Sequence, residues 1–175
     1  VYTSLQEIGL FEQFFVQSDH RLEKKLVVQL MKNTDQRVKN GKSVAPDFLL
    51  ATLLWFSVCK KIASYLSAGE NDFTARFKAM TFVLTEQGKK LNLPKRLVLM
   101  VKEIWAMQFK LEKFQGKRAE RLLGDYRFRS GYDLLVLRSQ IKEGKETQAL
   151  ETWWTDYTES SSSQRKALLS QLKTE

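Results

Sequence analysis

The chain has 175 residues, 43% of them hydrophobic and 28% charged, so it is long and apolar enough to fold around a core and is not wholly disordered. Its 29 Lys and Arg residues against 20 Asp and Glu give a formal charge of +9, which favours a polyanionic partner. A single cysteine, Cys59, and a single histidine, His20, exclude a disulfide framework and a Cys-rich or multi-histidine zinc site. This composition is compatible with a reducing compartment, and we expect a cytoplasmic protein.

Two prolines and eight glycines are few for a fold that needs many turns, and no segment alternates cleanly between apolar and polar residues. The sequence therefore predicts an all-α fold, a multi-helix body of about eight or nine helices without a substantial sheet. In chain order, apolar spacing and helix-end signals predict helices over about 5–15, 19–39, 46–66, 72–91, 94–115, 117–123 and 126–141, then one holding Trp153 and Trp154, and a last one over about 164–173.

The most apolar run, residues 48–58, holds eleven residues and is too short to cross a hydrocarbon layer of about 30 Å. We interpret it as part of a buried helix that begins at Pro46, and we expect no membrane partner. Trp55 and Trp105 lie within periodic apolar faces and are predicted to be core residues. On the next helix, Phe73 and Phe77 fall at helical spacing and are expected on its apolar face, together with Met80 and Leu84.

Positive charge concentrates between residues 95 and 129, where ten basic and four acidic side chains give a net charge of +6. Nucleic-acid binding needs cations that replace the counterions of phosphates, so this segment is predicted to bind single-stranded nucleic acid. Asp125 is expected to pair with Arg129, and Lys110 and Lys113 to share a helix face that Lys117 would join if the helix continued past Gly116. The phenylalanines of this segment are expected in the core. The candidate RNA-binding residues are Lys95, Arg96, Lys110, Lys113, Lys117, Arg118, Arg121 and Arg127.

Catalytic motifs are missing from the sequence. It has no glycine-rich phosphate loop, no Asp-x-Asp pair that would hold two metal ions, and no His-Glu-x-x-His. We therefore predict no catalytic residue, no metal site and no cofactor within these 175 residues.

Several short strings, taken in order and spacing, resemble the bacterial poly(A) polymerases. They cover most of the chain, from about residue 5 to residue 157. They are Lys32–Asp35, Pro46-x-Phe48-Leu49, Leu93–Leu97, Ile104–Gln108, Gln115–Ala119 with Leu122-Leu123, Arg127–Leu135, Leu137-Arg138 and Trp153-Trp154.

The resemblance implies a class II nucleotidyltransferase, related to the CCA-adding enzymes. In that family an N-terminal head carries a Gly-Ser motif and an Asp-x-Asp pair for metals, a neck recognises ATP, and a helical body holds the RNA 3′ end. The chain is thus expected to be the RNA-binding C-terminal part of a polynucleotide adenylyltransferase, inactive alone, with Mg²⁺ and ATP belonging to the head.

We expect residues 1–94 to form a helical body, 95–159 a basic RNA-binding region, and 160–175 a linker with a terminal helix; the three could form one continuous domain. The expected partner is the single-stranded 3′ end of RNA, bound without regard to sequence. Two alternatives stay open at this point: the body of a CCA-adding enzyme, and a non-enzymatic helical module that binds an acidic protein.

Overall fold

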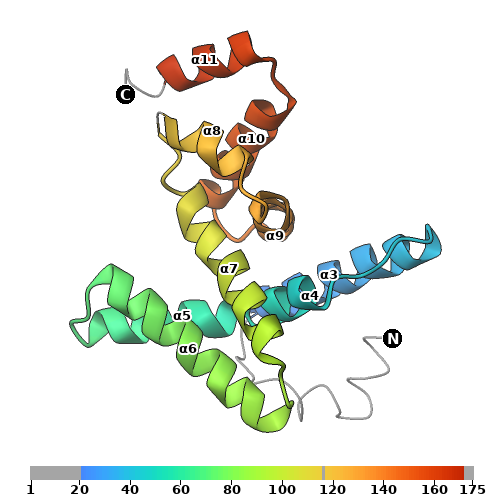
Figure 1. Ribbon diagram of the computed structural model, residues 1–175, viewed down its shortest axis with the longest axis vertical. Helices are drawn as coiled ribbons and strands as arrows, with labels where there is room; N and C mark the ends of the chain where they lie inside the picture. The colour runs from blue at the N-terminus through green and yellow to red at the C-terminus, as the bar shows by residue number, and fades with distance from the viewer. Residues whose placement is uncertain (1–20, 116, 172–175) are drawn as a thin grey trace. The chain divides into compact units, whose positions relative to one another are not determined.

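The structure of the protein is a computed structural model, which describes residues 21–115 and 117–171 (Figure 1). The predicted helix over 5–15, the start of the second helix, His20 and Gly116 lie outside these residues. All regular structure in the described part is helical, with no strand, which confirms the all-α prediction. The nine described helices are α3 (Arg21–Lys39), α4 (Pro46–Leu53), α5 (Trp55–Ser67), α6 (Asp72–Lys90), α7 (Lys95–Leu111), α8 (Lys117–Leu123), α9 (Phe128–Gln140), α10 (Lys145–Glu159) and α11 (Ser162–Gln171).

The chain divides into two compact units, residues 1–105 and 106–175, and the division falls inside α7. In the first unit α3 packs on α4, and α5 and α6 lie side by side as a helical hairpin (Figure 1). In the second unit α9 packs on α10, which also contacts α11. The expected boundaries at residues 94 and 159 divide the chain by role, and that division stays a prediction.

Local signals begin two helices of the first unit where the sequence predicts them. Pro46 opens α4, where its missing N–H costs no helical hydrogen bond. The side chain of Asn71 caps α6 by accepting a hydrogen bond from the backbone N–H of Thr74 at 2.9 Å. Both predicted tryptophans are buried, Trp55 at 2% and Trp105 at 0% exposed, which confirms that they belong to the core.

The predicted helix over 46–66 is two helices rather than one. Leu54 separates α4 from α5 with φ −98° and ψ 4°, and the two axes differ in direction by 49°. Leu54 is fully buried, and in the preceding helical turn the indole Nε1 of Trp105 donates to the carbonyl oxygen of Ala51 at 2.9 Å. The last turn of α4 before the bend is thus held by a residue 54 positions beyond Ala51 in the chain.

Within residues 21–115 and 117–171, no helix taken singly has both the length and the apolar character needed to cross a membrane; α4 and α5 reach that threshold only when counted together across their bend.

Helix α6 departs from the expected pattern. Its buried face is formed by Ala75, Ala79 and Val83, whereas Phe73 is 81% exposed and Phe77 is 57% exposed. The apolar stripe that the spacing indicates is therefore exposed at Phe73 and Phe77, half-buried at Met80 and buried at Leu84.

Helix α7 ends at Leu111, five residues before Gly116, where the sequence predicted its end. The backbone carbonyl of Leu111 accepts a hydrogen bond from the indole Nε1 of Trp154 at 3.1 Å, which satisfies one of the carbonyls that a helix end leaves unpaired. Trp154 is fully buried, while Trp153 is partly buried and stacks on Tyr157 with ring centroids 4.9 Å apart. One tryptophan of the pair is therefore a core residue, and the other lies against neighbouring rings.

Candidate nucleic-acid interface

Helix α8 presents three of the predicted cations on its exposed side. Ala119, in the middle of the helix, is fully buried against the core of the second unit, and Leu122 and Leu123 pack beside it. Because α8 docks through this side, Lys117, Arg118 and Arg121 are exposed. None of these three cations forms an ion pair within the described residues, so their charges are available to an outside anion.

Lys110 is partly neutralised by its own chain. Its ammonium Nζ lies 3.3 Å from Oδ2 of Asp125, in the turn that follows α8. Arg129, the expected partner of Asp125, instead pairs with Asp133 one helical turn further along α9, with Nε and Oδ1 3.0 Å apart. The expected Asp125–Arg129 pair is therefore wrong, because the tertiary contact between α7 and the turn takes Asp125.

Lys110, Lys113 and Lys117 do not share one helix face. Because α7 stops at Leu111, Lys113 lies in the following turn and Lys117 begins α8. All three are exposed. The expectation of a common face fails because the helix that would carry it ends before Lys113.

The remaining predicted cations are divided between the two units. Arg127 is partly buried in the second unit, and Lys95 and Arg96 are exposed at the start of α7 in the first. The second unit thus brings together six of the eight predicted residues, whereas Lys95 and Arg96 belong to a separate body. Their contact with RNA stays a prediction.

Sequence reasoning left Tyr126 out of the candidate residues, although it noted aromatic residues among the cations. Tyr126 is 75% exposed in the turn between α8 and α9, and the guanidinium carbon of Arg127 lies 5.0 Å from its ring centroid. The turn is fixed by Asp125, whose Oδ1 accepts a hydrogen bond from the backbone N–H of Arg127 at 2.9 Å. An exposed ring beside a cation is a surface on which a base can stack.

The phenylalanines of the basic segment are not such rings. Phe128 is buried, and Phe114 lies 4.1 Å from the ring of Trp153, so both contribute to the core as expected. Burial also raises the pKa of Tyr157 above its ordinary value of 10.0, opposed by the charge of Arg165 and helped by that of Glu120. Tyr157 is thus a neutral core residue, and the charge of this unit lies on exposed lysines and arginines.

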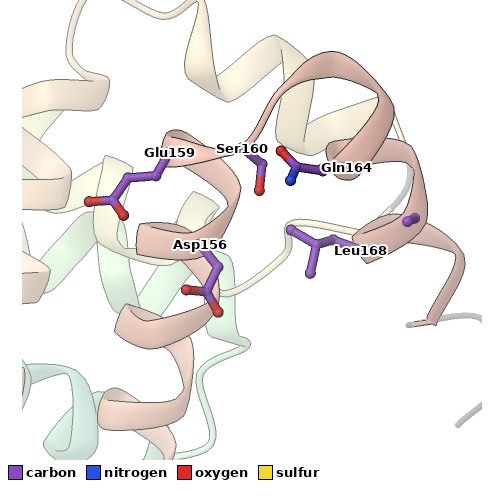
Figure 2. Close-up of a pocket in the computed structure, with 6 residues that line it drawn as sticks. Asp156, Glu159, Ser160, Gln164 and Leu168 are labelled. Carbon is purple, nitrogen blue, oxygen red and sulfur yellow. The ribbon is translucent and has the colours of Figure 1, made fainter.

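A pocket between α10 and α11 has a different character. Its volume is about 450 Å³, and Asp156, Glu159, Ser160, Gln164 and Leu168 contribute to its lining. In Figure 2 the carboxylate of Asp156 lies on the pocket side of α10, while that of Glu159 extends away from α11. Two carboxylates and no cation make this pocket a poor site for phosphate. Among the described residues, no group of three or more His, Cys, Asp or Glu side chains lies close enough to hold a metal ion.

Comparison with known proteins gives one consistent result. Residues 68–175 match the family model described as the polymerase A arginine-rich C-terminus. The chain is 33% identical to poly(A) polymerase I of Salmonella typhi over 181 residues and 34% identical to that of Escherichia coli O157:H7 over 184 residues. It is 31% identical to poly(A) polymerase I of Haemophilus influenzae over 176 residues. These alignments cover 96–99% of the chain but only 38–39% of each relative.

Proposed function

We propose that this chain, which belongs to the polymerase A arginine-rich C-terminus family, is the RNA-holding part of a polynucleotide adenylyltransferase. The parent protein adds AMP from ATP to the 3′ ends of RNA in the cytoplasm. The observation that carries the proposal is that Lys117, Arg118 and Arg121 on α8 are exposed and form no ion pair within the described residues, with the exposed ring of Tyr126 in the turn that follows α8.

The chemistry of these side chains suits an RNA strand that changes during the reaction. Exposed lysines and arginines bind phosphate oxygens, which are the same at every nucleotide and carry no sequence information. An aromatic ring stacks on any base, because every base has a flat face. A surface with only these contacts holds a primer before and after each addition, whatever its sequence.

The catalytic step is assigned to the rest of the parent protein. The chain spans about two fifths of the length of the curated relatives it matches. Transfer of AMP needs carboxylates that hold divalent metal ions at the reacting phosphate, and the described residues offer no such group. Mg²⁺ and ATP therefore belong, in this proposal, to a head that precedes these residues.

Two measurements test the proposal. We expect the 175-residue chain to bind unstructured oligo(A), oligo(U) and mixed-sequence RNA with similar affinities that fall steeply with salt. We also expect it to add no nucleotide to a primer in the presence of ATP and Mg²⁺. Preference for one sequence by more than about tenfold, or primer extension by the pure chain, would contradict the proposed role.

Two alternatives make different predictions. The body of a CCA-adding enzyme would favour transfer RNA over an unstructured strand, and the similarity to three poly(A) polymerases supports the polymerase instead. A module for an acidic protein would bind polyglutamate as tightly as it binds RNA of equal charge. The Tyr126 ring favours RNA, because polyglutamate has no base to stack on it.

A further inference from the structure

Two aromatic rings in the first unit stand uncovered on α6. Phe73 and Phe77 are four residues apart, so they lie one turn apart along the same side of the helix, about 6 Å along its axis. Large apolar side chains at this spacing normally face a core, and here they are 81% and 57% exposed. Exposing these two rings to solvent is energetically unfavourable. A role in binding would explain why they are exposed.

A lysine from the neighbouring helix α7 lies against this stripe. The Nζ of Lys102 is 5.6 Å from the ring centroid of Phe77 and 3.0 Å from Oγ1 of Thr81, both on α6. We call this cluster the Phe73 face: Phe73, Phe77 and Lys102.

The charge around the Phe73 face is positive and lacks free carboxylates to offset it. Residues 55–105 hold nine basic and four acidic side chains. Three of the four carboxylates form ion pairs on the same hairpin: Glu70 with Lys78, Asp72 with Arg76 at 2.7 Å, and Glu86 with Lys89 at 2.5 Å. Lys102 forms no ion pair within the described residues, so no carboxylate neutralises its charge beside the Phe77 ring.

We propose that the Phe73 face is a second contact for single-stranded RNA, at which unpaired bases stack on Phe73 and Phe77 while Lys102 binds an adjoining phosphate. This inference rests on the proposed function and adds to it a site on the first unit. Exposed rings beside a lysine that forms no ion pair are the combination that a flexible polyanion with flat bases requires. A protein partner would have to bury Lys102 away from water, and lysine is depleted at the centres of protein interfaces.

The test compares four forms of the full 175-residue chain in titrations with single-stranded RNA that carries 2-aminopurine at one position at a time. The forms are the unchanged chain, a double variant Phe73→Leu and Phe77→Leu, the matched control Val38→Ala, and a triple variant Lys117→Ala, Arg118→Ala and Arg121→Ala. Leucine keeps the apolar bulk and removes the ring. Val38 is an exposed apolar residue on α3, a helix that contributes no residue to the Phe73 face.

We expect the double variant to bind RNA roughly 5- to 100-fold more weakly than the unchanged chain, the range expected for one base that loses its stacking ring. The slope of log affinity against log salt should stay unchanged, because a phenyl ring releases no counterion. At one or two positions, 2-aminopurine fluorescence should be quenched by the unchanged chain and not by the double variant. Val38→Ala should bind like the unchanged chain, and the circular dichroism of all four forms should agree.

Failure of this inference can be told apart from failure of the proposed function. If the unchanged chain binds RNA and the α8 triple variant weakens that binding, but the double variant matches the unchanged chain, the Phe73 face is not an RNA contact and the proposed function stands. A loss of affinity as large in Val38→Ala would likewise overturn the inference. If the unchanged chain self-associates through this face, and the double variant abolishes self-association without weakening RNA binding, the face binds protein instead. If the unchanged chain shows no salt-dependent RNA binding, both proposals fall.

Discussion

The ammonium group of Lys110 lies 3.3 Å from the carboxylate oxygen Oδ2 of Asp125, across 15 residues of sequence. The other oxygen of the same carboxylate holds the turn that carries Tyr126, through the N–H of Arg127. Asp125 thus fixes the position of the turn and partly neutralises Lys110, one of the predicted RNA-binding residues. Removing its charge while keeping its shape separates these two effects.

Replacing Asp125 with Asn should strengthen RNA binding. Asparagine keeps an oxygen for the Arg127 N–H and releases Lys110, so we expect affinity to rise by about 1.5- to 5-fold, equivalent to about 0.2–1 kcal/mol for an exposed ion pair. The measurement is fluorescence anisotropy with labelled single-stranded RNA. Asp133→Asn is the matched control, because it removes the same charge from the pair with Arg129. An equal gain in both variants would mean that only net charge matters and that Lys110 has no particular role.

Adding a methyl group at Gly131 should destabilise the second unit. A β-carbon built on Gly131 of α9 would lie 2.2 Å from Cγ of Met107, and both residues are buried. We expect Gly131→Ala to lower the free energy of unfolding by about 1–3 kcal/mol, the usual cost of overpacking. Gly88→Ala on α6 meets nothing within 4 Å and should raise it by about 0.4–1 kcal/mol. Urea denaturation followed by circular dichroism measures both. An unchanged or higher free energy of unfolding for Gly131→Ala would contradict the close packing of α9 against α7.

Trp105 contributes to the first unit both by its volume and by the hydrogen bond from its indole to Ala51. Trp105→Ala should cost about 3–5 kcal/mol, as should Trp55→Ala. Trp105→Phe keeps a ring but leaves the Ala51 carbonyl without the indole donor, so its cost should be about 1–3 kcal/mol. Thermal or urea unfolding supplies the values. A loss below about 1 kcal/mol for either alanine variant would mean that the tryptophan is not a core residue.

The sequence predicts correctly those structural features that depend on residues close together in the chain. Pro46 and Asn71 begin their helices through contacts within four residues, and the small, buried Ala119 leaves the cations of α8 on the outside. The features it missed depend on residues far along the chain. Trp105 bonds to Ala51 in the turn before the bend at Leu54, and Trp154 caps the end of α7. Asp125 pairs with Lys110 rather than with Arg129, four residues away.

The exposure of Phe73 and Phe77 could not be predicted for a related reason. Helical spacing identifies the apolar stripe of a helix, but it does not say how far a neighbouring helix covers that stripe. In α6 the covering stops short of these two rings. The candidate cations could be named from the sequence because charge is visible there, and their contact with RNA stays a prediction. The ion pair that partly neutralises Lys110 depends on the fold.

The most direct test of the account is the salt dependence of RNA binding by the α8 triple variant Lys117→Ala, Arg118→Ala and Arg121→Ala. Its control is Arg21→Ala, Lys24→Ala and Lys25→Ala, which removes three exposed cations from α3 and changes the net charge equally. We predict that the slope of log affinity against log salt flattens by about two units in the α8 variant, because each lost single-strand phosphate contact removes roughly 0.7. In the α3 variant the slope should equal that of the unchanged chain. An unchanged slope in the α8 variant, or equal flattening in both, would contradict the claim that α8 holds the RNA backbone.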